Sequence, residues 1–175
     1  MKYYTSDLHF GHKNIIEYEN RPFRTVEEMD EALILAWNRK VRKGHEVYIL
    51  GDFGFISGER ANIILRRLNG QKYLIRGNHD NSFLKDKTFD RTRFEWIKDY
   101  ATIKDGSHLI CMFHYPIAVW DQQHHGSLHM YGHVHSNKDG HHPLVHDLGP
   151  NAINVGCDIH DFEPKTLGEL LRKGE

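Results

Sequence analysis

The sequence predicts an α/β layered domain. In the first half, short apolar runs alternate with helical patterns, and the second half consists mostly of further apolar runs. Nothing in the sequence resembles a linker or an internal repeat. The 175 residues are enough to bury a core without disulfides, so we expect one domain over residues 1–175.

The expected strands are short, apolar and bounded by Gly, Asp, Asn or His. They cover residues 2–6, 46–50, 72–76, 108–113, 128–131 and 152–155.

The helices between the strands carry clearer start signals. Thr25 and Glu28 form a capping-box pattern ahead of apolar residues at helical spacing. A second helix is expected over residues 59–68. Thr166 and Glu169 repeat the capping box and predict a helix near the C-terminus.

The amino-acid composition alone favours some classes of function over others. There are 23 basic and 24 acidic residues, so the formal charge of −1 indicates neither a nucleic-acid nor a membrane partner. Cys111 and Cys157 lie in or beside apolar runs, which is typical of reduced thiols. With no targeting or membrane-spanning pattern, we expect a cytoplasmic protein. The fifteen histidines favour a metal or acid/base site.

Five short polar signatures stand at the ends of expected strands, where loops of an open α/β sheet converge. Each is weak evidence alone, but coincidence is a poor explanation for the ordered set. Two carboxylates, an amide and several imidazoles suit one or two transition-metal ions better than Ca²⁺, Mg²⁺ or a structural zinc. The signatures are "DLH" (Asp7, His9), "GDF" (Asp52), "GNHD" (Asn78, His79, Asp80), "FHYP" (His114) and "GHVH" (His133, His135).

In this order, the signatures resemble those of the calcineurin-like metallophosphoesterase superfamily over nearly the whole chain. The resemblance implies a two-sheet β-sandwich flanked by helices, with two divalent transition-metal ions at one edge. Mn²⁺ is the first choice, and Fe, Zn²⁺ and Ni²⁺ are alternatives. By the same resemblance, one ion would be held by Asp7, His9, Asp52 and His135, and the other by Asp52, Asn78, His114 and His133, with Asp52 bridging.

The resemblance also implies an activity. We expect hydrolysis of a small phosphodiester, a nucleotide among the candidates, by hydroxide activated between the two metals. His79 would stabilise phosphate charge or protonate the leaving oxygen. Phe55 replaces the aspartate that follows the bridging residue in related protein phosphatases, so Asp80 is the nearest acid to orient His79. That departure argues against a protein serine/threonine phosphatase.

Several other residues are candidates for contact with substrate. His12 lies near His9, Arg76 precedes the "GNHD" signature, and His125 lies in the loop after His114. Trp120 in the same loop could stack a base, but packing of the loop onto the sheet is the favoured interpretation.

Other functions remain open at this stage. Phosphomonoester or pyrophosphate hydrolysis is the nearest alternative. A nuclease on polymeric DNA or RNA normally needs a basic track, which the balanced charge does not favour. A protein-binding scaffold that has lost its metals is disfavoured by the complete ligand set.

Overall fold

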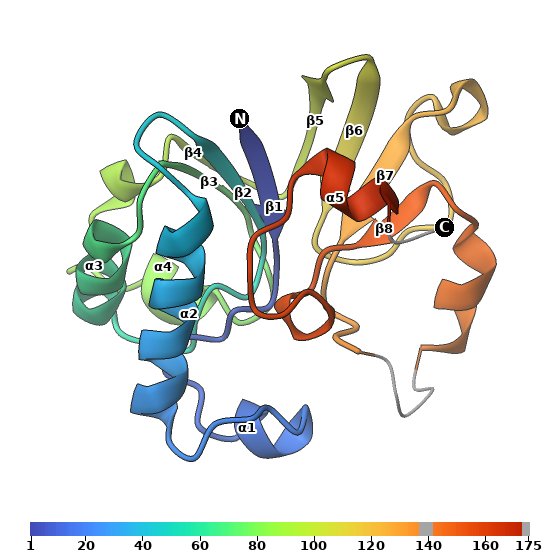
Figure 1. The fold of residues 1–175 in the computed structure, drawn as a ribbon. Helices are drawn as coiled ribbons and strands as arrows, with labels where there is room; N and C mark the ends of the chain where they lie inside the picture. The colour runs from blue at the N-terminus through green and yellow to red at the C-terminus, as the bar shows by residue number, and fades with distance from the viewer. Residues whose placement is uncertain (137–141, 173–175) are drawn as a thin grey trace.

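Two four-stranded sheets form the centre of the fold in the computed structural model, which describes residues 1–136 and 142–172 (Figure 1). The first sheet has the order β1-β2-β3-β4 and the second the order β5-β6-β7-β8. The predicted fold class, a two-sheet α/β sandwich, is confirmed. The strands are β1 (Lys2–Thr5), β2 (Glu46–Leu50), β3 (Gln71–Ile75), β4 (Trp96–Lys98), β5 (Tyr100–Asp105), β6 (His108–Phe113), β7 (Leu128–Tyr131) and β8 (Ala152–Asn154).

The first sheet is parallel throughout, and its strands β1 and β2 are buried on both faces. Its side chains alternate between two cores, as the two-residue period of a strand requires. In β2, Val47 and Ile49 pack against the helices, and Tyr48 and Leu50 pack against the second sheet. A strand covered on both faces reads as a continuous apolar run, which is why β2 was predictable.

The second sheet is mixed. Strands β5 and β6 form an antiparallel hairpin that pairs Asp105 with His108, and β6, β7 and β8 run parallel. Neither β4 nor β5 was predicted. The three residues of β4 give too little pattern, and β5 has polar residues on an exposed face. The Asp105-Gly106 turn signal was the available clue to the hairpin, and Gly106 adopts the positive φ of 58° that such a turn requires.

The helices from the first half of the chain cover the outer face of the first sheet, whereas the C-terminal helix packs Leu167 and Leu170 into the core between the two sheets (Figure 1). In α2 the side chain of Thr25 accepts a hydrogen bond from the Glu28 amide, and Glu28 in turn accepts from the Arg24 amide. The predicted first capping signal is thus confirmed. The helices are α1 (Ile15–Tyr18), α2 (Val26–Lys40), α3 (Gly58–Arg67), α4 (Asn81–Leu84) and α5 (Leu167–Arg172). The 3₁₀ turns are η1 (Arg91–Arg93), η2 (Gln123–His125), η3 (Pro143–Leu148) and η4 (Cys157–Ile159).

The C-terminal segment closes the sandwich at the edge formed by β1. Tyr4 and Lys165 exchange two backbone hydrogen bonds, and the amide of Cys157 donates to the carbonyl of Ser6. Thr166 and Glu169 form the reciprocal capping box of α5, as predicted. These contacts bring the chain after β8 beside the loop that follows β1.

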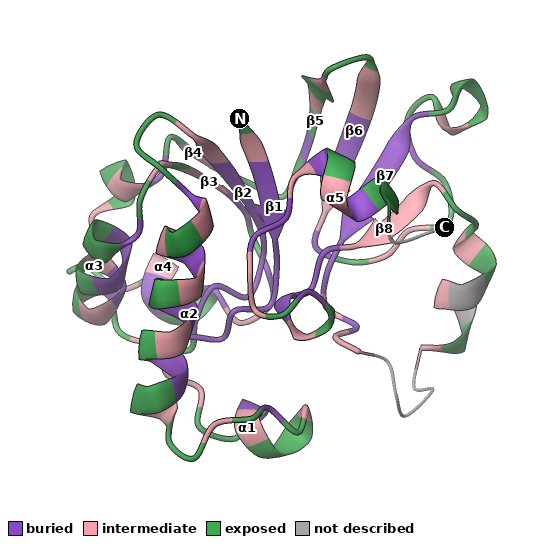
Figure 2. Cartoon of the chain, in the orientation of Figure 1, coloured by how far each residue is buried: buried purple, intermediate pink, exposed green. Residues whose placement is uncertain are grey.

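Figure 2 shows that β1, β2 and β7 are largely buried, that β5 and β8 are more exposed, and that α2 and α3 expose one face. The basic run at the end of α2 is engaged within the fold: Arg39 pairs with Glu163, and Lys40 pairs with Glu169. Across the described residues, no helix combines the length and apolarity needed to cross a bilayer.

Candidate metal centre

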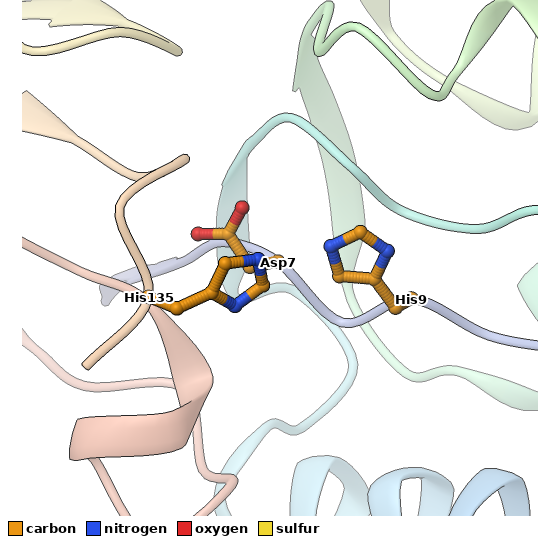
Figure 3. A group of neighbouring side chains, drawn as sticks. All are labelled: Asp7, His9 and His135. Carbon is orange, nitrogen blue, oxygen red and sulfur yellow. The ribbon is translucent and has the colours of Figure 1, made fainter. Parts of the chain in front are cut away.

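The loops that follow five strands bring the seven predicted donors to one end of the sandwich. Asp7 and His9 follow β1. In one group, the donor atoms of Asp7, His9 and His135 lie within 4.8 Å of one another. Figure 3 shows Asp7 and His9 on one segment, with the His135 side chain reaching toward them from a second segment. Donors of Asp52, His114 and His133 form a second group under the same criterion.

Asp52 lies between the two groups. Its Oδ2 atom is 3.7 Å from Nε2 of His9 and 3.5 Å from Nε2 of His114. Asn78 joins the second group, with its Oδ1 2.9 Å from His114 Nε2 and 3.1 Å from His133 Nδ1. The Asp52 carboxylate of the second group therefore lies within 3.7 Å of a donor of the first group.

Most of these donors lie on unusual backbone. Asp7, His9, Asp52, His133 and His135 have φ values between 47° and 70°, in the left-handed region. Such a conformation in a residue other than glycine costs about 1–3 kcal/mol and persists only where the surrounding structure enforces it. Five strained donors at one place mark a functional site.

Two glycines make the close approach of the loops possible. A Cβ atom on Gly77 would lie 2.2 Å from Oδ1 of Asp52, and one on Gly132 would lie 2.5 Å from Oδ2 of Asp7. Neither distance is sterically possible, so any side chain at these positions would displace a central carboxylate.

Hydrogen bonds orient two of the rings. Nδ1 of His114 donates to the carbonyl of Leu50 at 2.7 Å, and Nδ1 of His135 lies 2.8 Å from Oδ2 of Asp158. Asp158 is itself paired with Arg21 at 2.8 Å. In each neutral ring Nε2 therefore keeps its lone pair, as in metal-binding histidines whose other nitrogen is held by an oxygen acceptor.

The electrostatics of the second group favour a cation. Burial lowers the pKa of His114, but Asp52 and Asp7 more than compensate and raise it to about 9. For Asp52, burial acts in the opposite direction and raises the pKa, but His114 and His9 hold this pKa well below its usual value. A proton on His114 thus sits among oxygens of Asp52 and Asn78, and a divalent cation would displace it.

The first group contains a polar atom without a partner. Burial lowers the pKa of His9 well below its usual value, so the ring is neutral. Within residues 1–136 and 142–172, its buried Nε2 atom has no hydrogen-bond partner. An unsatisfied buried nitrogen is costly, and a cation between His9 and Asp52 would satisfy it. The donor set therefore fits divalent metal ions, with imidazole nitrogen and carboxylate oxygen as ligands.

Asp80 lies elsewhere than expected. It is fully buried, and its carboxylate accepts the amides of Asp52 (3.0 Å), Phe53 (2.8 Å) and Gly77 (2.7 Å). Burial raises its pKa to about 7, against the lowering effect of these hydrogen bonds. The expectation that Asp80 orients the His79 ring is corrected, because three backbone groups already occupy its oxygens. Asp80 instead ties the Asp52 loop to the Gly77 loop.

His79 and His12 lie at the mouth of the first group. The ring of His79 is 5.4 Å from that of His9, and its amide donates to Oδ1 of Asp52 at 2.9 Å. His12 approaches His9 with 3.3 Å between their Nδ1 atoms. The exposed ring of Phe55 lies 5.6 Å from His12 and 6.0 Å from His79.

The other substrate candidates differ in their positions. Arg76 lies beside Asn78 and binds Asp99 through Nε at 2.8 Å. His125 is exposed in η2 and is absent from the donor groups found among the described residues. Trp120 is buried, and its Nε1 donates to the carbonyl of Ser127, so the packing interpretation of this residue is confirmed.

Sequence reasoning missed two residues that support the site. Asp158 follows β8 as the predicted donors follow their strands, and this position could have revealed it. Arg21 gave no comparable signal. Its guanidinium donates to the carbonyls of Asp7 and Leu8 and thereby holds the strained loop after β1.

The two-sheet fold and the grouping of Asp and His donors are those that the resemblance to calcineurin-like metallophosphoesterases implies, and membership of that superfamily stays a prediction. No family profile matches the chain. The chain belongs to one family with the uncharacterized protein MJ1445 of Methanocaldococcus jannaschii, to which it is 32% identical over 99% of this chain and 92% of the relative.

Two further similarities span most of the chain. The Gene 66 protein of Mycobacterium phage L5 is 30% identical over 89% of this chain and 86% of its own length. The crystal structure of AQ665 from Aquifex aeolicus, a protein of unknown function, superimposes with a TM-score of 0.75 at 25% identity, covering 99% of this chain and 98% of that one. The similarity to AQ665 supports the fold.

Proposed function

We propose that this protein is a metal-dependent phosphoesterase that hydrolyses small phosphodiesters. The observation that carries the proposal is the pair of donor groups with Asp52 between them, together with the buried Nε2 of His9, which has no hydrogen-bond partner among the described residues. One ion would be held by Asp7, His9, Asp52 and His135, and the other by Asp52, Asn78, His114 and His133. Such ions would supply Lewis-acid polarisation of the phosphoryl group and lower the pKa of water.

The chain's own residues would position the ester. His79 stands at the mouth with its backbone fixed to Asp52, so its ring is within reach of an oxygen leaving from a phosphate held there. It would donate the proton that this oxygen needs. His12 and Phe55 would pack beside that leaving group, which gives one flank of the site an apolar and aromatic character.

A diester is favoured over a monoester because the site has two flanks. Phe55 and His12 border the side of His9, and Tyr115 borders the side of Asn78. Each flank could hold one ester substituent. Asn78 and Tyr115 are exposed and His79 and His133 are half-buried, so the centre is open to ligands.

The test pairs metal content with turnover. Purified protein loaded with Mn²⁺ is assayed with bis(4-nitrophenyl) phosphate, 4-nitrophenyl phosphate, cyclic nucleotides and dinucleotides. Asp52→Asn should lose about one metal equivalent and more than the roughly 10- to 100-fold in rate that outer partners contribute. Asp105→Asn is the matched control, because that carboxylate lies in the β5–β6 hairpin and accepts the Tyr4 hydroxyl.

Wild type and Asp105→Asn should both hydrolyse diesters faster than the monoester. Absence of turnover on every diester would overturn the proposal, as would retention of full metal content and activity by Asp52→Asn.

A further inference from the structure

A polar groove of about 650 Å³ leads away from the candidate metal centre. It begins at Asn78 and follows the junction of the two sheets, where β4 ends and β5 begins. The lining residues used below are Arg76, Asn78, Lys85, Asp99, Phe113 and Tyr115.

The groove carries excess positive charge although the whole chain is close to neutral. Arg76 is held by Asp99 through its guanidinium, which fixes the direction of that side chain. Lys85 supplies a second, exposed ammonium group. A smaller pocket of about 190 Å³ shares these three residues and adds Arg91 and Lys98. Among the described residues, the groove and this pocket together are lined by four cations and one carboxylate, which favours an anionic ligand.

One wall of the groove is aromatic and reaches the centre. The rings of Phe113 and Tyr115 lie 5.5 Å apart. The Tyr115 hydroxyl is 3.4 Å from Oδ1 of Asn78, and its ring is 4.6 Å from that of His133. A ligand along this wall would therefore touch two candidate metal ligands at one end and the cations at the other.

We propose that the groove binds the second phosphate and the adjoining nucleoside of a nucleotidic phosphodiester. This inference rests on the proposed function, since the scissile phosphate would lie at the metal centre. Phe113 and Tyr115 would pack against the ribose or base, and Arg76 and Lys85 would bind the next phosphate. The substrate class is a dinucleotide or the end of a short oligonucleotide, in preference to a cyclic mononucleotide with a single phosphate.

The first test measures binding and needs no turnover. Thymidine 3′,5′-bisphosphate and thymidine 5′-monophosphate are titrated calorimetrically into Mn²⁺-loaded protein. The bisphosphate should bind about 10-fold more tightly, as expected for one added charge-assisted contact. Lys85→Ala and the charge reversal Lys85→Glu should remove most of that preference and change monophosphate affinity by less than about 2-fold.

Lys87→Ala is the matched control. Lys87 lies two residues from Lys85, is also exposed and carries the same charge, but it does not line the groove. It should retain the preference for the bisphosphate. Equal affinity of wild type for both ligands would overturn the inference, as would an equal loss in Lys85→Ala and Lys87→Ala, which would indicate a general charge effect.

The second test separates this inference from the proposed function. The KM of a 5′-phosphorylated dinucleotide should rise about 10-fold in Lys85→Ala, with the KM of bis(4-nitrophenyl) phosphate unchanged. Hydrolysis of both substrates with no effect of Lys85 would overturn the groove inference alone. A Lys85-dependent preference for the bisphosphate without hydrolysis of any diester would overturn the phosphoesterase proposal and support the groove as a binding site.

Discussion

The substitution Gly77→Ala tests how closely the loops of Gly77 and Asp52 pack in the candidate metal centre. In Gly77→Ala the new Cβ would lie 2.2 Å from Oδ1 and 2.3 Å from the backbone nitrogen of Asp52. Both contacts are far inside van der Waals distance, so either the Gly77 loop or Asp52 must move. Movement of Asp52 also threatens the 2.9 Å hydrogen bond from the His79 amide.

The cost follows from these contacts. Overpacking a close-packed interior costs about 1–3 kcal/mol. Loss of a hydrogen bond to a charged group adds about 1.5–3 kcal/mol where it breaks fully. We expect Gly77→Ala to reduce the free energy of unfolding by about 2–4 kcal/mol, and a chain of this length loses about 2–4 °C in Tm per kcal/mol.

Urea unfolding of the cation-free protein measures the loss of stability. The Mn²⁺ stoichiometry of the folded variant measures whether a displaced Asp52 still binds metal. Gly168→Ala is the control: it lies in α5, and a Cβ there meets nothing within 4 Å. That variant should be more stable by about 0.4–1 kcal/mol. Gly77→Ala with wild-type stability and full Mn²⁺ content would refute the assigned contact between the two loops.

Three further substitutions test the surroundings of the centre. In Asp80→Asn, the new amide NH₂ should face the Phe53 N–H if its oxygen keeps the Asp52 and Gly77 amides, so urea unfolding should show a loss of about 1–3 kcal/mol. Unchanged stability would contradict this. Asp158→Asn should weaken Mn²⁺ binding, measured by competition with a chelating dye, by about 10- to 100-fold; an unaltered affinity would remove Asp158 as the partner that orients His135. Partial burial raises the pKa of Glu169, but Lys40 and Thr166 lower it to about 2, from an ordinary value of 4.5. Because this pKa is depressed in the fold, the stabilisation is present above about pH 4.5 and is lost as the pH falls toward 2. Glu169→Gln should therefore be less stable than wild type, by up to about 1 kcal/mol, only at the higher pH. A difference in Tm that persists at pH 2 would contradict the assignment.

Strands and helices with a strong local pattern could be predicted from the sequence. The continuous apolar run of β2 and the capping boxes of α2 and α5 appear where expected. Strands β4 and β5 could not be predicted in the same way. Strand β4 is only three residues long, and β5 pairs with β6 while carrying polar residues on an exposed face.

The residues that could supply the chemistry were identifiable before the fold was known, because donor type and position at a strand end are local properties. His9, Asp52 and His135 were therefore identifiable. The roles of two further carboxylates depend on tertiary structure: Asp80 accepts the amides of Asp52 and Phe53, and Asp158 lies within hydrogen-bond distance of His135. Hydrogen-bond partners across more than twenty residues of separation depend on how the loops pack, and no local pattern encodes them.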